Sequence, residues 1–401
     1  MGLKKIGLMI STLNSGGAER VVAHLSHILQ EKYDVHVILF EDTYLEYECG
    51  GTLHSLDVPA REGSGTAVKV GILLKRISAL RKLIRRERFS CVISFMDSPN
   101  FVNLLTRVRG CRRVISIRNY SALENRRSRP GRLTDRAMKL LYRSADHVVT
   151  VSRLIEMDFR ESYRIPAGRI STIYNPFRFE DVARLGSVPL TGEDAAFFGG
   201  HFVFLNVGRV THQKGGWHLL RAFGAVREAY PEARLALVGE DWSEGRLTKM
   251  ISDMGLTDAV LLTGRTRNPY QYMARAQCYV LSSLFEGFPN ALVEAMACAC
   301  PVIAADCRSG PREILFEEPD LSDTAQTVVE ADYGLLVPPL EMAEDWTAGP
   351  LTEGEKQLAA AMERMLTDPA YAAQAGKRAQ ERSRDFGCEV CAARFERVIE
   401  G

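Results

Sequence analysis

Short apolar runs alternate with amphipathic helical patterns along most of this 401-residue chain. Runs such as Lys5–Ile10, Cys91–Phe95 and Cys278–Leu281 have the length and composition of buried strands. Each leads through a turn containing Gly or Pro into a helical pattern. Strands that alternate with helices predict βαβ units, and therefore an α/β fold with parallel sheets.

The alternation is interrupted once, over residues 178–200. This stretch is loop-like and carries five residues that favour turns, namely Gly186, Pro189, Gly192, Gly199 and Gly200. Charge changes at the same place: residues 1–190 hold 31 Lys and Arg against 19 Asp and Glu, whereas the remainder holds 20 against 31. We therefore expect two domains with different surfaces, joined by a linker at 178–200.

Several classes of protein are disfavoured by composition. No apolar run reaches the roughly 18 residues needed to span a bilayer. The first residues lead directly into a strand pattern, so no signal peptide is expected. The nine cysteines are scattered, and Cys388-x-x-Cys391 has no second Cys or His pair, so it is interpreted as packing. These features predict a cytosolic protein. The net charge of +1, without a basic domain carrying interleaved aromatics, argues against nucleic-acid binding.

The most informative stretch is 283–296, where a buried strand passes through a Gly/Pro turn into a helix expected to open at Asn290 as its N-cap. Glu286 falls on the loop at the carboxyl end of the strand, and Glu294 lies about one turn into the helix. Ligands of open α/β sheets bind at such strand ends, and helix N-termini favour phosphate. Two carboxylates flanking an anion site suit a nucleotide sugar, which has hydroxyls at both ends and phosphate between.

Two further strand–turn–helix segments carry features that suit a phosphate ligand. Gly16 and Gly17 follow the first strand, and either let backbone amides approach a phosphate or sugar closely or form a plain tight turn. Arg209 and Lys214 flank the turn after the strand that begins at Phe202. This pair suits a diphosphate; ordinary surface charge is the alternative.

Residues 66–89 predict an amphipathic helix with a strongly basic polar face. Its apolar face is formed by Val70, Leu73, Leu74, Ile77, Leu80 and Ile84, and eight Lys and Arg occupy the rest. The helix either packs on the core with a solvated basic face or faces anionic lipid headgroups. A second basic segment, 126–132, suits either solvent or an anionic acceptor.

Taken in order with Tyr174-Asn175-Pro176, these motifs resemble a retaining glycosyltransferase of family 4, with the GT-B fold, over nearly the whole chain. The segments 16–20 (Gly-Gly-Ala-Glu-Arg) and 309–313 (Ser-Gly-Pro-Arg-Glu) resemble the branch that builds bacterial surface glycans on lipid carriers. The resemblance implies two Rossmann-like domains facing a cleft: an acceptor domain at 1–180 and a donor domain at 200–380. A C-terminal helix at 381–401 would return to the first domain.

The resemblance also implies residue roles. Arg209 and Lys214 would hold the donor diphosphate and neutralise the leaving group, with Glu286 as the third catalytic residue, contacting the transferred sugar as an electrostatic and positioning group rather than a covalent nucleophile. Glu294 would bind the ribose hydroxyls. The remaining donor-binding positions are Gly16, Gly17, Gly287, Phe288, Asn290, Ala291 and Leu292.

Arg118 and Asn119 would lie on the acceptor side. Arg118 stands where many relatives carry His, and Arg cannot act as a base, so it is interpreted as a ligand for an anion or sugar.

The implied reaction moves a hexose or N-acetylhexosamine from a nucleoside-diphosphate sugar, with a UDP-sugar favoured, to a polyprenyl-diphosphate-linked or other glycan acceptor. The product would belong to a capsule, exopolysaccharide, O-antigen or glycoprotein glycan. No metal cofactor is expected, because Arg209 and Lys214 would meet the leaving charge and no Asp-x-Asp motif is present. The expected location is cytoplasmic, peripheral at the inner face of the plasma membrane and in contact with anionic lipid. The alternatives are another nucleotide-sugar enzyme of the same fold (a 2-epimerase or soluble-acceptor transferase) or a non-catalytic nucleotide-sugar sensor.

Overall fold

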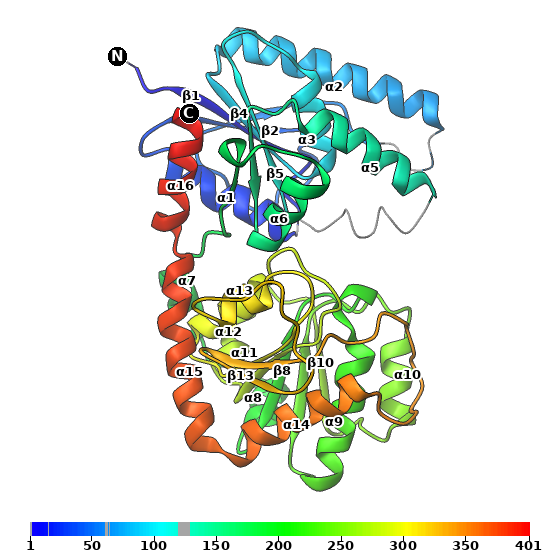
Figure 1. Cartoon of the computed structure of the whole chain (residues 1–401). Helices are drawn as coiled ribbons and strands as arrows, with labels where there is room; N and C mark the ends of the chain where they lie inside the picture. The colour runs from blue at the N-terminus through cyan, green and yellow to red at the C-terminus, as the bar shows by residue number, and fades with distance from the viewer. Residues whose placement is uncertain (1, 15, 61–62, 64, 119–128) are drawn as a thin grey trace. The chain divides into compact units, whose positions relative to one another are not determined.

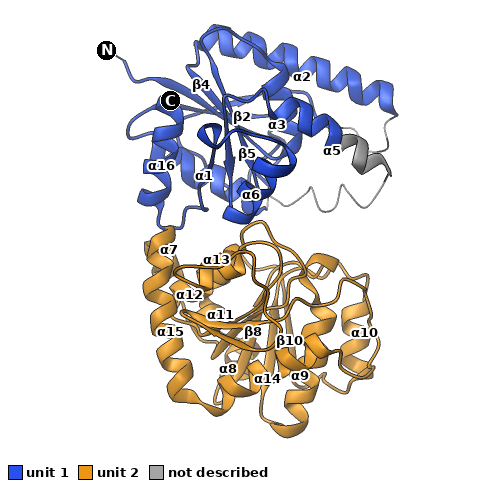
Figure 2. Cartoon of the chain, viewed as in Figure 1, with its two compact units in different colours: residues 1–177, 387–401 blue, residues 178–386 orange. Residues whose placement is uncertain are grey.

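The computed structural model describes residues 2–14, 16–60, 63, 65–118 and 129–401, and for 129–134 it describes the backbone alone (Figure 1). The predicted acceptor-side residue Asn119 and the side chains of the basic segment 126–132 lie outside this description. The chain forms two compact units, residues 1–177 with 387–401 and residues 178–386 (Figure 2). The sequence analysis put the first boundary within 178–200 and the second at residue 381.

The first unit is a seven-stranded sheet covered by helices. Its elements are β1 (Lys5–Ile10), α1 (Gly17–Leu29), β2 (Asp34–Leu39), β3 (Thr52–Ser55), α2 (Thr66–Glu87), β4 (Cys91–Phe95), α3 (Asp97–Leu105), β5 (Arg112–Ile117), α5 (Arg129–Tyr142), β6 (His147–Thr150), α6 (Arg153–Ser162), η1 (Ala167–Arg169), β7 (Ile170–Thr172) and α16 (Cys388–Glu400).

All strand pairs of this sheet are parallel, in the order β3-β2-β1-β4-β5-β6-β7. The central strands are buried on both faces, which is why their sequences are almost wholly apolar. The C-terminal helix α16, red in Figure 1, lies beside α1 and packs Phe395, Val398 and Ile399 into the same core. Ion pairs from Lys32 to Glu396 (2.9 Å) and from Lys4 to Glu400 (2.8 Å) lie at its rim.

The second unit repeats this architecture. Its elements are α7 (Phe179–Gly186), α8 (Gly192–Phe198), β8 (Val203–Val207), η2 (His212–Lys214), α9 (Gly216–Ala229), β9 (Arg234–Val238), α10 (Arg246–Asp253), β10 (Val260–Gly264), α11 (Tyr270–Met273), β11 (Cys278–Leu281), α12 (Asn290–Ala297), β12 (Val302–Ala305), α13 (Pro311–Leu315), β13 (Val329–Ala331), β14 (Gly334–Val337), α14 (Glu353–Thr367), α15 (Pro369–Ser383) and η3 (Arg384–Phe386).

Its strand order is β10-β9-β8-β11-β12-β14-β13, and the edge strand β13 runs antiparallel to β14. The two sheets therefore share one plan. In each, the chain first adds strands on one side of the starting strand and then crosses to the other side. The crossing leaves β1 beside β4 and β8 beside β11. These neighbouring pairs are the topological switch points, where the loops leaving two adjacent strands diverge and ligands bind.

Two parts of the sequence analysis need correction. The stretch 178–200, interpreted as loop-like, contains α7 and α8. Each has two acidic residues in its first turn, Glu180 and Asp181 in α7 and Glu193 and Asp194 in α8, which favour helix formation at its positive end. The short length of both helices and the turn residues around them hid this signal.

The helix predicted at 66–89 forms as α2, but only part of its apolar face is buried. Leu80 and Ile84 are in the core, whereas Val70 and Leu74 are 50% and 61% exposed. The N-terminal half of α2 therefore carries apolar side chains that the first unit does not cover. In the part of the chain that the structure describes, no helix has both the length and the hydropathy of a membrane span.

Candidate active site

The switch point of the second sheet gathers the loops that follow β8 and β11. The β8 loop contains Gly208, whose φ of 151° lies in the region that favours glycine. It packs closely against the next loop, since a Cβ built on Gly239 would lie 2.1 Å from the Gly208 carbonyl oxygen. Gly215, with φ of 59°, allows the chain to turn from η2 into α9, and its own Cβ would lie 2.4 Å from the Ser282 carbonyl oxygen. Gly239 thus lets the loop after β9 approach the β8 loop, and Gly215 lets the β8 loop approach the loop after β11.

This close approach brings the Lys214 ammonium into contact with the Glu286 carboxylate. The Lys214 ammonium donates to Glu286 Oε1 at 2.7 Å, and Ser283 Oγ donates to the same oxygen at 2.7 Å. Gln213 Nε2 donates to Glu286 Oε2 at 3.3 Å. The carboxylate is 6% exposed, so it is a buried charge compensated by one cation and two neutral donors.

Hydrogen bonds also fix the backbone at Glu286. Its N–H donates to the Arg308 carbonyl at 2.8 Å, and its own carbonyl accepts from Ser309 N–H at 2.9 Å. A salt bridge between Arg312 Nη2 and Asp306 Oδ2 (2.6 Å) stabilises the segment that supplies these partners. Burial and these bonds leave Glu286 in one defined position, which is what a positioning residue requires.

Arg209 lies on the same loop as Lys214 but on its exposed side. Its guanidinium stacks over the Trp242 ring, with Cζ 4.7 Å from the ring centroid, and no described carboxylate forms an ion pair with it. Arg209 is therefore oriented by an aromatic contact that leaves its N–H groups for a ligand.

Helix α12 holds the second carboxylate. It begins at Asn290, and its N-cap is Pro289, which makes no side-chain cap; the expectation that Asn290 is the N-cap is wrong by one residue. Glu294 is 3% exposed and accepts a hydrogen bond from Tyr270 Oη at 3.3 Å. The positions preceding and starting the helix, Gly287, Phe288, Ala291 and Leu292, are buried or half-buried in the same segment.

The predicted site residues of the first unit follow two of its strands, Gly16 and Gly17 after β1 and Arg118 after β5. Gly16 is the N-cap of α1 and Gly17 its first residue. A Cβ on Gly16 would lie 1.9 Å from Glu19 Oε2, so the Glu19 carboxylate folds over this turn into the space that a side chain would occupy.

Arg118 follows β5 and is 7% exposed. It donates to Asn175 Oδ1 and to Ser116 Oγ (3.4 Å), and its Cζ lies 5.6 Å from the Phe95 ring centroid. No described carboxylate pairs with it, and burial lowers the pKa of Arg118 to about 10. A buried, unneutralised guanidinium is costly to a fold, so Arg118 is a candidate binding group.

The structure thus brings Lys214, Glu286, Arg209 and Glu294 into one unit around one switch point, and Gly16, Gly17 and Arg118 into the other. Sequence reasoning missed Ser283, Gln213 and Trp242 as partners. Ser283 and Gln213 lie close to Glu286 and Lys214 in the recognised motifs, so the sequence could have suggested them as partners. The stacking of Trp242 on Arg209 had no sequence signal. Asn175 was noted in a motif, without its contact to Arg118.

Chemically, the second unit's site combines cations, buried carboxylates and a helix N-terminus at strand ends, which suits a polar ligand bearing phosphate. In the described part of the chain, no group of three or more His, Cys, Asp or Glu side chains is arranged to hold a metal ion. Whether the reaction needs a metal stays a prediction.

Family models match both units. Residues 16–176 match the glycosyl transferase 4-like domain, and residues 192–319 match glycosyl transferases group 1. An uncharacterised glycosyltransferase of Methanocaldococcus jannaschii is 30% identical over 340 residues, covering 82% of this chain and 84% of the relative. The N-acetylgalactosamine-N,N'-diacetylbacillosaminyl-diphospho-undecaprenol 4-alpha-N-acetylgalactosaminyltransferase of Campylobacter jejuni is 30% identical over 323 residues, covering 79% and 84%.

Solved structures agree on the fold. Sucrose-phosphate synthase from Thermosynechococcus elongatus superposes with a TM-score of 0.76 at 20% identity, over 99% of this chain and 98% of the other. Anabaena HepE in complex with UDP-glucose superposes with a TM-score of 0.72 at 18% identity, over 99% of each chain. The predicted GT-B fold is confirmed, and the chain belongs to the group 1, family 4-like glycosyltransferases.

Proposed function

We propose that this glycosyltransferase moves a hexose or N-acetylhexosamine, with retention of configuration, from a nucleoside-diphosphate sugar to a lipid-linked glycan acceptor. The donor favoured is a UDP-sugar. The observation that carries the proposal is the 2.7 Å contact between Lys214 and Glu286 at the switch point of the second unit. Lys214 suits the leaving diphosphate and Glu286 suits the transferred sugar. Their contact therefore places a group for each half of the donor side by side.

The chemistry follows from charge. An ammonium has three donors, and Glu286 occupies one of those of Lys214, so two are available to diphosphate oxygens. Arg209, held by Trp242, supplies a second cation. Together they would stabilise the negative charge that develops on the departing nucleoside diphosphate. This charge is the main contribution to the barrier to displacement at the anomeric carbon. The buried Glu294 would accept hydrogen bonds from ribose hydroxyls at the start of α12.

The acceptor would bind to the first unit. The name of the Campylobacter jejuni relative specifies an acceptor linked to diphospho-undecaprenol, a membrane lipid. Helix α2 supports a peripheral membrane contact here, because Val68, Val70 and Leu74 are 45%, 50% and 61% exposed beside Lys69 and Lys75. Exposed apolar side chains flanked by lysines suit the headgroup region of an anionic bilayer.

The test is Lys214→Ala, assayed for sugar transfer from nucleoside-diphosphate sugars to a polyprenyl-diphosphate-linked glycan. We expect turnover to fall by about 100-fold or more, because a fixed cation at the leaving group is lost. The variant should still fold, with a lower melting temperature, because the buried Glu286 carboxylate loses its cation. The matched control is Lys249→Ala, which removes a lysine paired with Asp253 on the surface of the same unit and should leave turnover unchanged.

Near-normal turnover of Lys214→Ala would remove this residue from the diphosphate site. The anomeric configuration of the product, read by NMR, tests retention separately: an inverted product would contradict the mechanism while leaving the donor assignment intact. Transfer to water or to a free sugar alone, with no use of the lipid-linked acceptor, would favour a soluble-acceptor enzyme.

A further inference from the structure

The turn that carries Lys214 is contacted by a segment far away in the sequence, residues 341–347, which we call the strap. The strap belongs to the loop between β14 and α14 and contains neither helix nor strand. Its Trp346 packs edge-on against Trp217, with the ring centroids 5.3 Å apart. Trp217 is fully buried at the start of α9, whereas most side chains of the strap are exposed. The strap therefore covers the start of α9 from outside.

Two buried polar side chains of α9 hold the strap. His218 and Arg221 are 2% and 3% exposed. His218 Nε2 lies 2.9 Å from the Glu341 carbonyl oxygen, and Arg221 Nε donates to the Thr347 carbonyl at 2.9 Å. The buried carboxylate of Glu355, 2.7 Å from His218 Nδ1, orients the imidazole ring. Because packing locks both side chains, they fix the backbone of the strap at its two ends.

His212 connects the strap to the turn. Its Nε2 donates to the Met342 carbonyl at 2.9 Å, since a carbonyl can only accept. His212 is the first residue of η2, and Lys214 is the last. Within the turn, the Lys214 N–H donates to the Thr211 carbonyl at 3.0 Å and the Gly215 N–H donates to the His212 carbonyl at 3.2 Å. A displacement of His212 is therefore transmitted to Lys214 through a single turn of backbone.

The loop after β11 fixes the opposite side of the turn. The Leu284 N–H donates to the Gln213 carbonyl at 2.8 Å, and Ser282 Oγ donates to the Lys214 carbonyl at 2.9 Å. Gln213 and Lys214 thus have partners on that loop, and His212 has its partner on the strap. The hydrogen bonds within a 3₁₀ turn have poor geometry, so contacts with neighbouring segments decide where a turn as short as η2 lies.

We infer that His212 is a positioning residue for Lys214. Its hydrogen bond to the strap fixes the start of η2, and so fixes the point from which the Lys214 side chain reaches Glu286. This position matters because misplacing a group by about 1 Å can lower a rate by about 100-fold. The inference rests on the proposed role of Lys214 at the leaving diphosphate. The alternative is that the hydrogen bond of His212 only stabilises the fold.

The experiment is a double-mutant cycle, in which sugar transfer from a radiolabelled donor is measured below the melting temperature of each protein. Its variants are His212→Ala, Lys214→Ala and the two combined. His212→Gln is the conservative variant, because a side-chain amide can supply the N–H that the Met342 carbonyl accepts.

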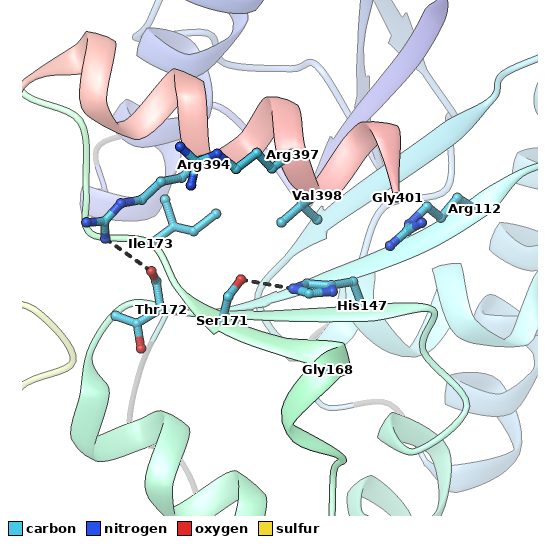
Figure 3. A pocket seen from close by; sticks show the side chains of 10 residues that line it. All are labelled: Arg112, His147, Gly168, Ser171, Thr172, Ile173, Arg394, Arg397, Val398 and Gly401. Atoms are coloured by element: carbon cyan, nitrogen blue, oxygen red, sulfur yellow. Dashed lines mark hydrogen bonds between the residues drawn. The ribbon is translucent and has the colours of Figure 1, made fainter.

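The control is His147→Ala. His147 is also half-buried and hydrogen-bonded, to Ser171 Oγ at 2.9 Å. It belongs to the first unit, where it lines a hollow beside α16 and β7, as Figure 3 shows. It therefore matches His212 in residue type and burial without contacting η2 or the strap.

We expect His212→Ala to lower kcat by about tenfold and to change the KM for the donor by less than about threefold, because Lys214 acts on charge that develops in the transition state. His212→Gln should recover most of the rate. In the Lys214→Ala background, His212→Ala should have no further effect on kcat, because its effect passes through the missing ammonium. His147→Ala should leave kcat unchanged.

Three outcomes would each overturn the inference: a normal kcat for His212→Ala, an equal fold-loss with and without Lys214, or no recovery in His212→Gln. An equal fold-loss together with a lower melting temperature would show that His212 only stabilises the fold. Near-normal turnover of Lys214→Ala would instead contradict the proposed function, so the failure of the one is distinguishable from the failure of the other.

Discussion

Glu286 accepts hydrogen bonds from Lys214, Ser283 and Gln213 while almost fully buried, so its charge is fixed in place by the protein. Three donors around one carboxylate leave it little freedom to swing towards an anomeric carbon. This geometry supports the interpretation of Glu286 as an electrostatic and positioning residue.

We expect Glu286→Gln to lower turnover by about 100-fold, the scale of losing one preorganised electrostatic group. The unfolding free energy should fall by about 1–2 kcal/mol, because the new amide cannot accept from all three donors. Steady-state kinetics and urea unfolding measure the two effects. Glu330→Gln, which removes the partner of Arg364 at the surface of the same unit, is the control. A glycosyl adduct on Glu286, detected by mass spectrometry of the wild type, would contradict the positioning role.

Arg118 presents the opposite case, a buried cation with neutral partners. Its pKa of about 10 in the folded state lies below the ordinary value of 12.5, so the fold disfavours the charged form. Between these values the unfolded chain binds more protons, and the free energy of unfolding therefore rises with pH in that window. At neutral pH the cost of burying the charge is fully present.

Arg118→Met should therefore raise the unfolding free energy, by about 1–2 kcal/mol at neutral pH, while sugar transfer is lost. The gain over wild type should shrink above about pH 10. Arg113→Met is the matched control on the same strand. Arg113 pairs with Asp146 and donates to two carbonyls, so its loss should destabilise the protein. If Arg118→Met is also destabilised, Arg118 is a structural residue.

Sequence analysis found the charged residues of the site but few of their partners. Lys214 and Glu286 were named because each follows a predicted strand, and the order of strands in the sheet then brings them together. Their distance in sequence, 72 residues, shows why the contact itself could not be predicted without the strand order. The stacking of Arg209 on Trp242 depends on the packing of neighbouring loops, which leaves no periodic signal.

At the scale of elements, prediction succeeded where a segment is long or wholly buried and failed where it is short. The central strands were predicted because burial on both faces demands continuous apolar residues. Helices α7 and α8 were missed because turn residues flank them on both sides. Helix α2 was predicted as an element, but its hydrophobic pattern could not show that its N-terminal half lies beyond the core.

The N-terminal half of α2 carries exposed apolar side chains, and its C-terminal half is rich in Lys and Arg. Both features predict that α2 binds anionic membranes. Replacing Arg81, Lys82, Arg85 and Arg86 with Gln should abolish sedimentation with anionic vesicles, because each Lys or Arg near such a surface contributes about 1 kcal/mol. Leu74→Asp should weaken the same binding without changing stability, since this side chain is 61% exposed. Val390→Asp, at an exposed position of α16, is the apolar-to-acidic control. Undiminished sedimentation of the fourfold variant would reduce α2 to a packing helix.

At the scale of the whole molecule, one strand plan occurs twice, and each copy has a switch point. Both carry glycine-bearing loops, but the second alone combines Arg209, Lys214, Glu286 and Glu294. This difference supports our proposal that the nucleotide binds within residues 178–386, as the family resemblance implied.

A nucleoside diphosphate should therefore raise the melting temperature, and the matching nucleotide sugar should raise it further. At 100 times the dissociation constant, the stabilisation is about 2.7 kcal/mol. A thermal-shift screen across nucleotides and their sugars would identify the donor. Glu294→Ala should reduce the shift caused by the bare nucleoside diphosphate, because the ribose contacts are lost. An unchanged affinity of Glu294→Ala for the nucleoside diphosphate would contradict the ribose assignment. The absence of any thermal shift in the wild type would count against the donor site.

The return of the chain to its first unit sets the order in which the protein is completed during synthesis. Phe395, Val398 and Ile399 belong to the core of the first sheet, yet they emerge from the ribosome after all of residues 178–386. At about 5–20 residues per second, the first unit waits roughly 10 to 40 s with part of its core uncovered. The unit that begins first is therefore finished last. Until then its apolar surface is open to chaperones, and a nascent chain stalled before residue 387 would expose that surface for as long as the stall lasts.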